Sequence, residues 1–396
     1  ITAYGELHAE GTVSSPIEFG INPAVTRNCT HGWWSGIKSD TPNSGKTPLL
    51  LRNVTIWGTR QAGSSCSSAY DMLRTGYFGR SNSFSALDNL TLYDGGRVYF
   101  QNYGGTSAKW QINNITIHNM TYVEHSSNQF HNRCGGGSWN GEVSLTDVNE
   151  VELYQVGYAS MSNSATYCLD YSATVSNWTF TRITSRLSAR YYDWTSSTAA
   201  RPLFFQGTFT DVSKLDLRAE SYTTYQAMKH STFTDTRVEI TPSSSSSRQM
   251  EMSNNTFIDS QIVLKASSGS SSTGLILRDS TFTSTKAPPT TGSWTSYYID
   301  GNDYGKWIIQ NNSFTPANGW KNLRYTYNIG NMRAPYNWWG SASNTTIDSN
   351  ISDYLDSNGG GWVNYSPFWK SAAMTQLDWN GTTPSSLPLP QSVSGT

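Results

Sequence analysis

The sequence predicts an all-β protein folded as a parallel β-helix, a solenoid in which short strands stack rung upon rung. One phrase recurs between residues 203 and 285: a short strand containing Thr-Phe, then Asp, then a second apolar strand. It stands at Thr208-Phe209-Thr210-Asp211, Thr232-Phe233-Thr234-Asp235 and Thr256-Phe257-Ile258-Asp259, with a degenerate copy at Ser280-Thr281-Phe282. The four phenylalanines are 24, 24 and 25 residues apart, a period that is typical of repeat proteins.

The alternation of apolar and polar residues explains why these units must stack. In Thr232-Phe233-Thr234 the ring points to one side of the strand, and Val238 and Ile240 in the next strand point to the same side. Asp suits the bend between the two strands because its side chain can bond nearby backbone N–H groups. No rung can bury its own Phe, so we expect parallel ladders about 4.8 Å apart.

The pattern extends in both directions and predicts one continuous solenoid of about ten or more rungs, with insertions at some corners. Upstream copies include Asn53-Val54-Thr55-Ile56 and Asn89-Leu90-Thr91-Leu92, and Asn312-Ser313-Phe314 follows downstream. The predicted rung anchors, 24 to 36 residues apart, are Ile56, Leu92, Ile117, Leu145, Phe180, Phe209, Phe233, Phe257, Phe282 and Phe314. We expect the six phenylalanines among them to form a single inward-pointing core stack.

The chain divides into four predicted regions. Residues 1–50 are poorly periodic and are expected to form an N-terminal cap or first strands, because an open solenoid end exposes an unpaired edge. Residues 51–333 form the β-helix, residues 334–370 a C-terminal capping segment, and residues 371–396 a Pro- and Ser-rich tail. Ile347, Ile351 and Leu355 fall at helical spacing, which predicts a short amphipathic helix over the last rung.

The composition indicates an extracellular or cell-surface protein. The formal charge is −1 and only 14% of residues are charged, which argues against recognition of nucleic acid by bulk charge. No apolar run approaches the roughly 20 residues that cross a bilayer. Because the sequence starts at Ile1 and not at Met, we expect an exported and processed chain; an artificial boundary is the alternative.

The four cysteines, Cys29, Cys66, Cys134 and Cys168, allow three disulfide pairings. None forms a Cys-x-x-Cys pair, which disfavours a zinc ribbon. Export favours disulfides, and the preferred pairing joins Cys29 to Cys66 and Cys134 to Cys168, each tying down an insertion. Four free buried thiols are the alternative.

The C-terminal region carries the clearest likeness to known proteins. It reads Asn337-Trp338-Trp339-Gly340, then Ile347, Ile351 and Asp353, then Gly361-Trp362-Val363-Asn364-Tyr365-Ser366-Pro367-Phe368. This succession resembles the segment that closes many surface proteins of the pectate-lyase-like superfold. The resemblance spans roughly residues 50 to 370 and implies a single-stranded, right-handed parallel β-helix. It implies no single activity, since that superfold hosts lyases, hydrolases, tailspikes, adhesins and structural proteins.

Twelve Asn-x-Ser/Thr sequons make the chain a candidate glycoprotein. Several of them coincide with the rung phrase, in which Asn stands at a corner and Thr on a strand, so a purely structural role is the competing explanation. The candidate sites are Asn28, Asn53, Asn89, Asn114, Asn119, Asn177, Asn254, Asn311, Asn344, Asn350, Asn364 and Asn380.

Enzyme signatures are weak. The Asn-Thr-Asp, Asp-Asp, Gly-His-Gly and Arg-Ile-Lys strings that polygalacturonases of the superfold carry do not occur. A uronate lyase would need a base near groups that neutralise the substrate carboxylate. The candidate cations are Arg182, Arg186 and Arg190, Lys229 with His230, and His125 with His131 and Arg133. The four-residue spacing of the three arginines follows a strand phrase and fits scattered surface charge better than a site. His125, His131 and Cys134 could ligate a metal but fit ordinary loop residues better, so no catalytic residue, metal or cofactor is assigned.

Two classes of function follow. Low charge, sequons, cysteines and abundant Trp and Tyr favour a structural glycoprotein that assembles with itself into a sheath, coat layer or filament. The second class is a polysaccharide lyase or glycosidase acting near residues 118–142 and 187–202, and a glycan-binding adhesin is a third reading. The expected partner is therefore a second copy of the chain, with glycans as the other candidate.

Overall fold

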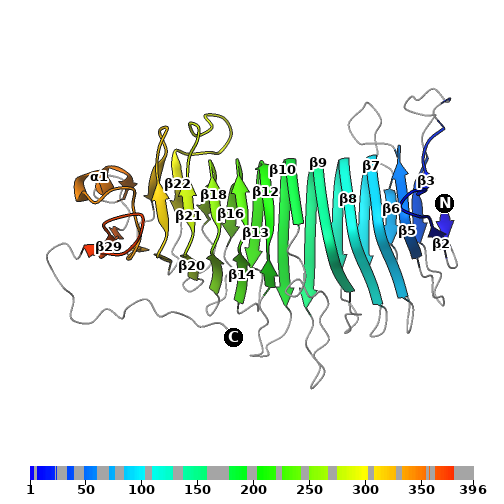
Figure 1. Cartoon of the computed structure of the whole chain (residues 1–396), viewed down its shortest axis with the longest axis horizontal. Helices are drawn as coiled ribbons and strands as arrows, with labels where there is room; N and C mark the ends of the chain where they lie inside the picture. The colour runs from blue at the N-terminus through cyan, green and yellow to red at the C-terminus, as the bar shows by residue number, and fades with distance from the viewer. Residues whose placement is uncertain are drawn as a thin grey trace, which may run out of the picture.

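In the computed structural model the chain is a long solenoid whose strands lie across its axis in chain order (Figure 1). Ladders between named strands are parallel, with the exception of the hairpin β29 (Phe368–Trp369) and β30 (Leu377–Asp378). The predicted fold class, an all-β parallel β-helix, is confirmed. The structure describes residues 1–3, 7–22, 24, 34–39, 49–59, 71–75, 84–102, 109–127, 137–157, 178–193, 203–219, 225–241, 249–265, 274–301, 307–326, 332–353, 356 and 362–378, to which the statements below refer.

The strands line three faces of the solenoid, here called faces 1, 2 and 3. Face 1 holds β3 (Ile17–Phe19), β12 (Gly207–Val212), β15 (Thr232–Thr234), β18 (Thr256–Ile258), β21 (Thr281–Thr283) and β24 (Ser313–Thr315). Face 2 follows it in the chain and holds β1 (Thr2–Ala3), β4 (Ile37–Ser39), β6 (Asp71–Thr75), β13 (Leu215–Ala219), β16 (Arg237–Thr241), β19 (Gln261–Leu264), β22 (Tyr297–Gly301), β25 (Lys321–Tyr325) and β27 (Ile351–Ser352).

Face 3 closes each turn before face 1 begins again. It holds β2 (Leu7–Glu10), β11 (Leu203–Phe205), β14 (Tyr225–Lys229), β17 (Gln249–Ser253), β20 (Gly274–Arg278), β23 (Ile308–Gln310), β26 (Met332–Arg333) and β28 (Val363–Asn364). The long strands β5 (Leu49–Trp57), β7 (Phe84–Asn102), β8 (Lys109–Ser127), β9 (Gly137–Gly157) and β10 (Trp178–Asp193) run through bends and serve more than one face.

Two columns of left-handed residues turn the chain at the edges of face 1. Asn and Asp dominate them because their short polar side chains tolerate the left-handed region better than other residues do. Asn254 before face 1 has φ 55° and Asp259 after it has φ 50°. The first column contains Asn53, Asn89, Asn114, His230, Asn254, Asp279 and Asn311, and the second Asp94, Asn119, Asp147, Arg182, Asp211, Asp235 and Asp259. The predicted bend at Asp is thus confirmed.

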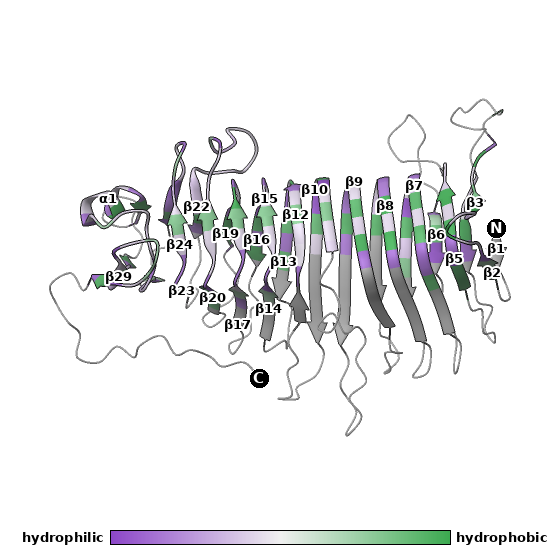
Figure 2. Ribbon diagram, viewed as in Figure 1, coloured by the Kyte–Doolittle hydropathy of each residue, from purple (hydrophilic) through white to green (hydrophobic). Residues whose placement is uncertain are grey.

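A column of aromatic rings fills the core behind face 1. Phe180, Phe209, Phe233, Phe257, Phe282 and Phe314 are fully buried, and successive ring centroids lie 5.2, 4.9, 4.6, 4.5 and 4.7 Å apart. Trp339 extends the column at 4.8 Å from Phe314. Ile56, Leu92, Ile117 and Leu145 continue it toward the N-terminus with aliphatic side chains. Figure 2 shows the resulting alternation of apolar and polar residues along the strands.

Buried polar side chains link the rungs beside this column. The Oδ1 atom of Asn255 accepts from the backbone N–H of Ser231 at 2.9 Å, and Ser280 Oγ accepts from the N–H of Asn255 at 3.2 Å. Asn312 and Asn337 extend the same ladder toward the C-terminus. Since a buried polar group without a partner costs free energy, this ladder favours one register for the stacked rungs.

The C-terminal end of the solenoid is closed. The helix α1 (Asn344–Ser349) begins after the N-cap Ser343 and buries Ile347 over the last rung. It is shorter than the predicted helix because Ile351 belongs to β27, where it pairs with Leu323. Leu355 lies outside the described residues.

The N-terminal end is built differently. Strands β1, β2 and β3 form the first rungs, and each is paired on one side, β1 with β4 and both β2 and β3 with β5. Their inward residues are less buried than the residues they pair with in the next rung. Leu7, Ile17 and Phe19 are partly exposed, whereas their partners Leu49, Val54 and Ile56 are at most 1% exposed.

Candidate functional site

The outer surface of face 1 carries two columns of side chains in register, and these are named here the threonine face. In the first column nearly every rung contributes Thr: Thr55, Thr91, Thr116, Ser144, Thr179, Thr208, Thr232, Thr256, Thr281 and Ser313. The second column, two residues further along each strand, is Trp57, Tyr93, His118, Thr146, Thr181, Thr210, Thr234, Ile258, Thr283 and Thr315.

The hydroxyl groups of this face differ from those inside the solenoid. Inner hydroxyls are used: Ser260 Oγ, for example, accepts from the backbone N–H of Thr236 at 3.0 Å and donates to the carbonyl of Ile258 at 2.8 Å. Within the described residues, no hydroxyl of the threonine face bonds to another residue of the chain. The face is half-buried to exposed, as expected for side chains standing side by side on a sheet.

Paired charges border the threonine face along the second left-handed column. Arg182 donates from Nε and Nη2 to Asp147 at 2.5 and 2.7 Å, and Lys286 Nζ lies 2.5 Å from Asp235. The hydrogen bonds from Arg182 hold the pKa of Asp147 below its ordinary value. The acidic residues at this edge are therefore partly neutralised in place.

Aromatic rings occupy the N-terminal part of the second column. Trp57 lies 6.0 Å from Tyr93 and Tyr93 lies 4.9 Å from His118, with interplanar angles of 3° and 2°. Burial, followed by the charges of Glu18 and Asp94, raises the pKa of Tyr93. Because the rings are stacked on one another, their faces are not free to stack on a sugar along the middle of the column.

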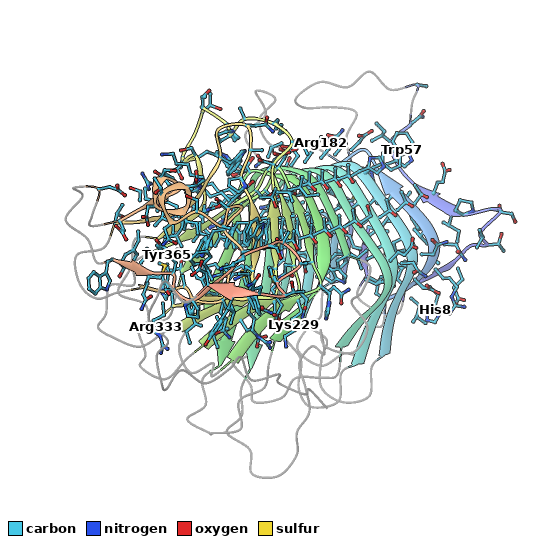
Figure 3. The ribbon with its side chains drawn as sticks, turned by 60° about the vertical axis from the view of Figure 1, so that its left-hand side comes forward. His8, Trp57, Arg182, Lys229, Arg333 and Tyr365 are labelled. Atoms are coloured by element: carbon cyan, nitrogen blue, oxygen red, sulfur yellow. The ribbon has the colours of Figure 1, made fainter. Side chains whose placement is uncertain are left out.

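Within the described part of the chain, the cations considered as catalytic candidates do not converge. Arg182 lies at the edge of face 1, whereas Lys229 lies on face 3. In Figure 3 Arg182 is at the top of the molecule, beside the label of Trp57 from face 1, and Lys229 is near the bottom. Arg186 on face 2 contacts Glu150 and Glu152 at 2.6 and 2.5 Å. Lys229 is 3.5 Å from Glu251, and burial together with Arg278 lowers its pKa. The side chains of His125 and Arg190, and all of His131 and Arg133, lie outside the described residues.

A buried ion cluster on face 2 is a feature that the sequence analysis did not identify. Glu239 is 3% exposed although it points away from the core, and its Oε2 lies 2.9 Å from Lys214 Nζ and 2.5 Å from Lys265 Nζ. Arg237 donates to its other oxygen, and burial lowers the pKa of this arginine. Asp216, the register partner of Glu239, is 1% exposed.

This cluster resembles a catalytic site only in that it holds two neighbouring carboxylates. Asp216 and Glu239 stand in register on adjacent rungs, and glycosidases likewise use a pair of carboxylates. Both are shut away from solvent, however, and cations surround Glu239. A polymer could not reach them in this conformation, so the geometry fits a structural role that fixes face 2. Its only sequence signal is the charged residue between two apolar ones, as in Val238-Glu239-Ile240.

The described sequon residues fall into two groups. Asn53, Asn89, Asn114, Asn119, Asn254 and Asn311 occupy left-handed bends. Several of these amides are engaged, since Asn53 donates to the carbonyl of Gly11 at 2.9 Å and Asn89 donates to Asn53 Oδ1 at 2.7 Å. Asn344, Asn350 and Asn364 lie in the closing segment, where Asn364 is exposed. Asn28, Asn177 and Asn380 lie outside the described residues.

The predicted cysteine sites lie in parts of the chain that the structure does not describe. Cys29, Cys66, Cys134 and Cys168 all lie outside the described residues. Within the described ranges, His, Cys, Asp and Glu form no group of three or more that could hold a metal ion. In the same ranges, no helix has the length and apolar character needed to cross a bilayer.

Comparison with known proteins adds no relative. No protein-family model, no curated protein and no solved structure matches this chain.

Proposed function

We propose that this chain is a structural subunit of an extracellular assembly and that copies associate through the first described rungs, formed by β1, β2 and β3. The observation that carries the proposal is the contrast between the two ends of the solenoid. At the C-terminal end the last inward residues are covered, with Trp339 fully buried and Ile351 and Val363 at 5% and 7% exposure. At the N-terminal end Leu7, Ile17 and Phe19 remain partly exposed.

The first rung offers both parts of an association surface. Its strands have one edge without a partner strand within the described residues, and such an edge is a template for pairing with another chain. Apolar side chains lie beside that edge, and Val13 at the tip of the turn between β2 and β3 is 82% exposed. Covering these residues would be favourable by roughly 25 cal/mol per Å² of apolar surface.

The first rung of a second copy fits this surface better than the C-terminal end of a second copy does. Because α1 and the β29–β30 hairpin cover the last rung, its strands cannot continue the first rung of a neighbour without rearrangement. Two first rungs related by a two-fold axis can face each other directly and bury the same residues on both copies. Polymer growth would then need a second contact along the flank.

The finer features of the proposal come from the sequence. The closing segment around Asn337 and Pro367 supports the right-handed, pectate-lyase-like type of β-helix. We propose that the four cysteines pair as disulfides and that glycans are carried at exposed sequons such as Asn364. A carbohydrate-active enzyme has less support, because the described candidates Arg182, Arg186 and Lys229 are held in separate ion pairs.

Analytical ultracentrifugation of the purified chain tests the end contact. The wild type is expected to dimerise or polymerise with concentration, and Val13→Lys should weaken association because it places a charge in the contact. Trp362→Lys is the matched control, since Trp362 is a 53% exposed apolar residue in the closing segment. A wild type that stays monomeric at high concentration, or equal weakening by the two variants, would overturn the proposal.

A further inference from the structure

We propose that the threonine face binds the surface of ice. This goes beyond the structural role proposed above and rests on a different part of the molecule. The central observation is that Thr or Ser occupies the first column in unbroken register from Thr55 to Ser313. From Thr146 to Thr315 the second column is also Thr, interrupted only by Ile258.

The ladders arrange the side chains of this face as a regular lattice. Successive rungs place equivalent side chains about 4.8 Å apart along the axis, and residues i and i+2 of one strand lie about 6.6 Å apart. These two repeats are close to the spacings of water oxygens on faces of hexagonal ice. A flexible ligand would have to be ordered to match such an array, whereas a crystal surface already has the required order.

The chemistry of the face suits ordered water. Each Thr hydroxyl can donate and accept, and its methyl group stands beside it, so the face combines hydrogen-bonding and apolar patches at a fixed interval. The hydroxyls are not engaged within the described chain, in contrast to inner hydroxyls such as Ser260 and Thr236. A single hydrogen bond contributes only about 1 kcal/mol net, but a rigid array engages many at once.

The array is also rigid before it meets a ligand. The threonines from Thr55 to Thr283 are carried on strands that are paired on both sides, as Thr232 is between Thr208 and Thr256. The inward neighbour of Thr232 is Phe233, whose ring is stacked at 4.9 and 4.6 Å between Phe209 and Phe257. Little conformational freedom of the backbone therefore remains to be lost on binding.

Other partners fit the threonine face less well. Nucleic acids and anionic polysaccharides require cations, and neither column contains Lys or Arg. A neutral sugar chain would favour free aromatic faces, but Trp57, Tyr93 and His118 are stacked on one another.

Ice-recrystallisation inhibition and thermal hysteresis of the purified chain test the proposal. The wild type is expected to suppress recrystallisation and to shape ice crystals. Thr232→Lys should abolish both effects because a long charged side chain interrupts the array, and Thr232→Val should weaken them while keeping the β-branched shape. Thr345→Lys is the control, since Thr345 lies exposed on α1, away from face 1.

Circular dichroism and thermal melting must first show that all three variants fold like the wild type. A folded wild type without either effect on ice would overturn the proposal, and so would equal activity of Thr232→Lys and Thr345→Lys. Binding to an insoluble neutral polysaccharide such as cellulose, with no effect on ice, would likewise overturn it and assign the face to glycans.

Discussion

The rings of Phe233 and Phe257, on adjacent rungs, lie 4.6 Å apart with 7° between their planes, and both are fully buried. Parallel stacking of identical residues at the rung spacing makes the core a continuous column. Since every ring contacts the next, loss of one ring leaves a cavity that both neighbours line.

Phe257→Ala should therefore lower the free energy of unfolding by about 3–5 kcal/mol, measured by denaturant titration. The adjacent outward residue offers a matched control. Thr256→Ala should change the stability by less than about 0.5 kcal/mol, because surface substitutions away from special features have small effects. Similar losses for the two variants would contradict the core role of the phenylalanine column.

The buried amide ladder predicts a graded response at Asn255. Asn255→Val leaves the backbone N–H of Ser231 without its acceptor and should cost about 1–3 kcal/mol. Asn255→Ser should cost less, because Ser231 and Ser280 already fill the equivalent position in neighbouring rungs. The comparison of their thermal midpoints checks the ladder, and a reversed order would contradict it.

The ion cluster on face 2 predicts a large effect from one buried carboxylate. Glu239→Ala should destabilise the chain by about 3–5 kcal/mol, since it leaves Lys214, Arg237 and Lys265 without their shared partner. Glu10→Ala is the control, because Glu10 forms a 3.4 Å pair with Arg52 at the surface, worth about 0–1 kcal/mol. Equal unfolding midpoints for the two variants would show that the cluster contributes nothing special.

Tyr298 predicts a loss of stability in alkali. Burial raises its pKa to about 12 in the folded chain, against an ordinary value of 10.0, and its hydroxyl donates to the carbonyl of Thr315 at 3.1 Å. The unfolded chain therefore loses this proton first, so the contribution of Tyr298 is complete below pH 10 and declines as the pH rises from 10 toward 12. Tyr298→Phe should show a flatter stability profile over this range, and an unchanged slope would contradict the assignment.

The Asp147–Arg182 pair gives an opposite dependence on the acid side. The lowered pKa of Asp147 means that its contribution is complete above the ordinary carboxyl pKa and is lost as the pH falls through the lowered value. Arg182→Ala should raise the pKa of Asp147 in an NMR titration. A pKa that stays low without the guanidinium would assign the shift to another cause.

Much of the fold follows from the sequence because the repeat is local and regular. The repeat around Phe209, Phe233 and Phe257 predicts where each strand lies, which side chains point inward and where the chain bends, and the structure has all three. The first rung was harder to predict, since residues 7–19 match the phrase only through Ile17-Glu18-Phe19. The predicted C-terminal helix was too long, because the spacing of Ile347 and Ile351 fits a helix. In the structure Ile351 pairs with Leu323 and lies in a strand.

The candidate sites were less predictable for two physical reasons. Burial of the outward residue Glu239 depends on what covers face 2, and local alternation carries no information about that. The register of the threonine columns depends on the stacking of every rung, so it appears only when the ladders from Thr55 to Ser313 are known. Threonine is also a common residue in strands, so its recurrence in the repeat does not by itself predict a continuous array on one face.

Cryo-electron microscopy of the native material tests the central claim most directly, because it shows which part of the solenoid contacts a neighbour. The account predicts that the first rungs of two copies abut and that Leu7, Ile17 and Phe19 become buried in the contact. Particles in which these residues face solvent, while neighbours meet elsewhere or are absent, would contradict it.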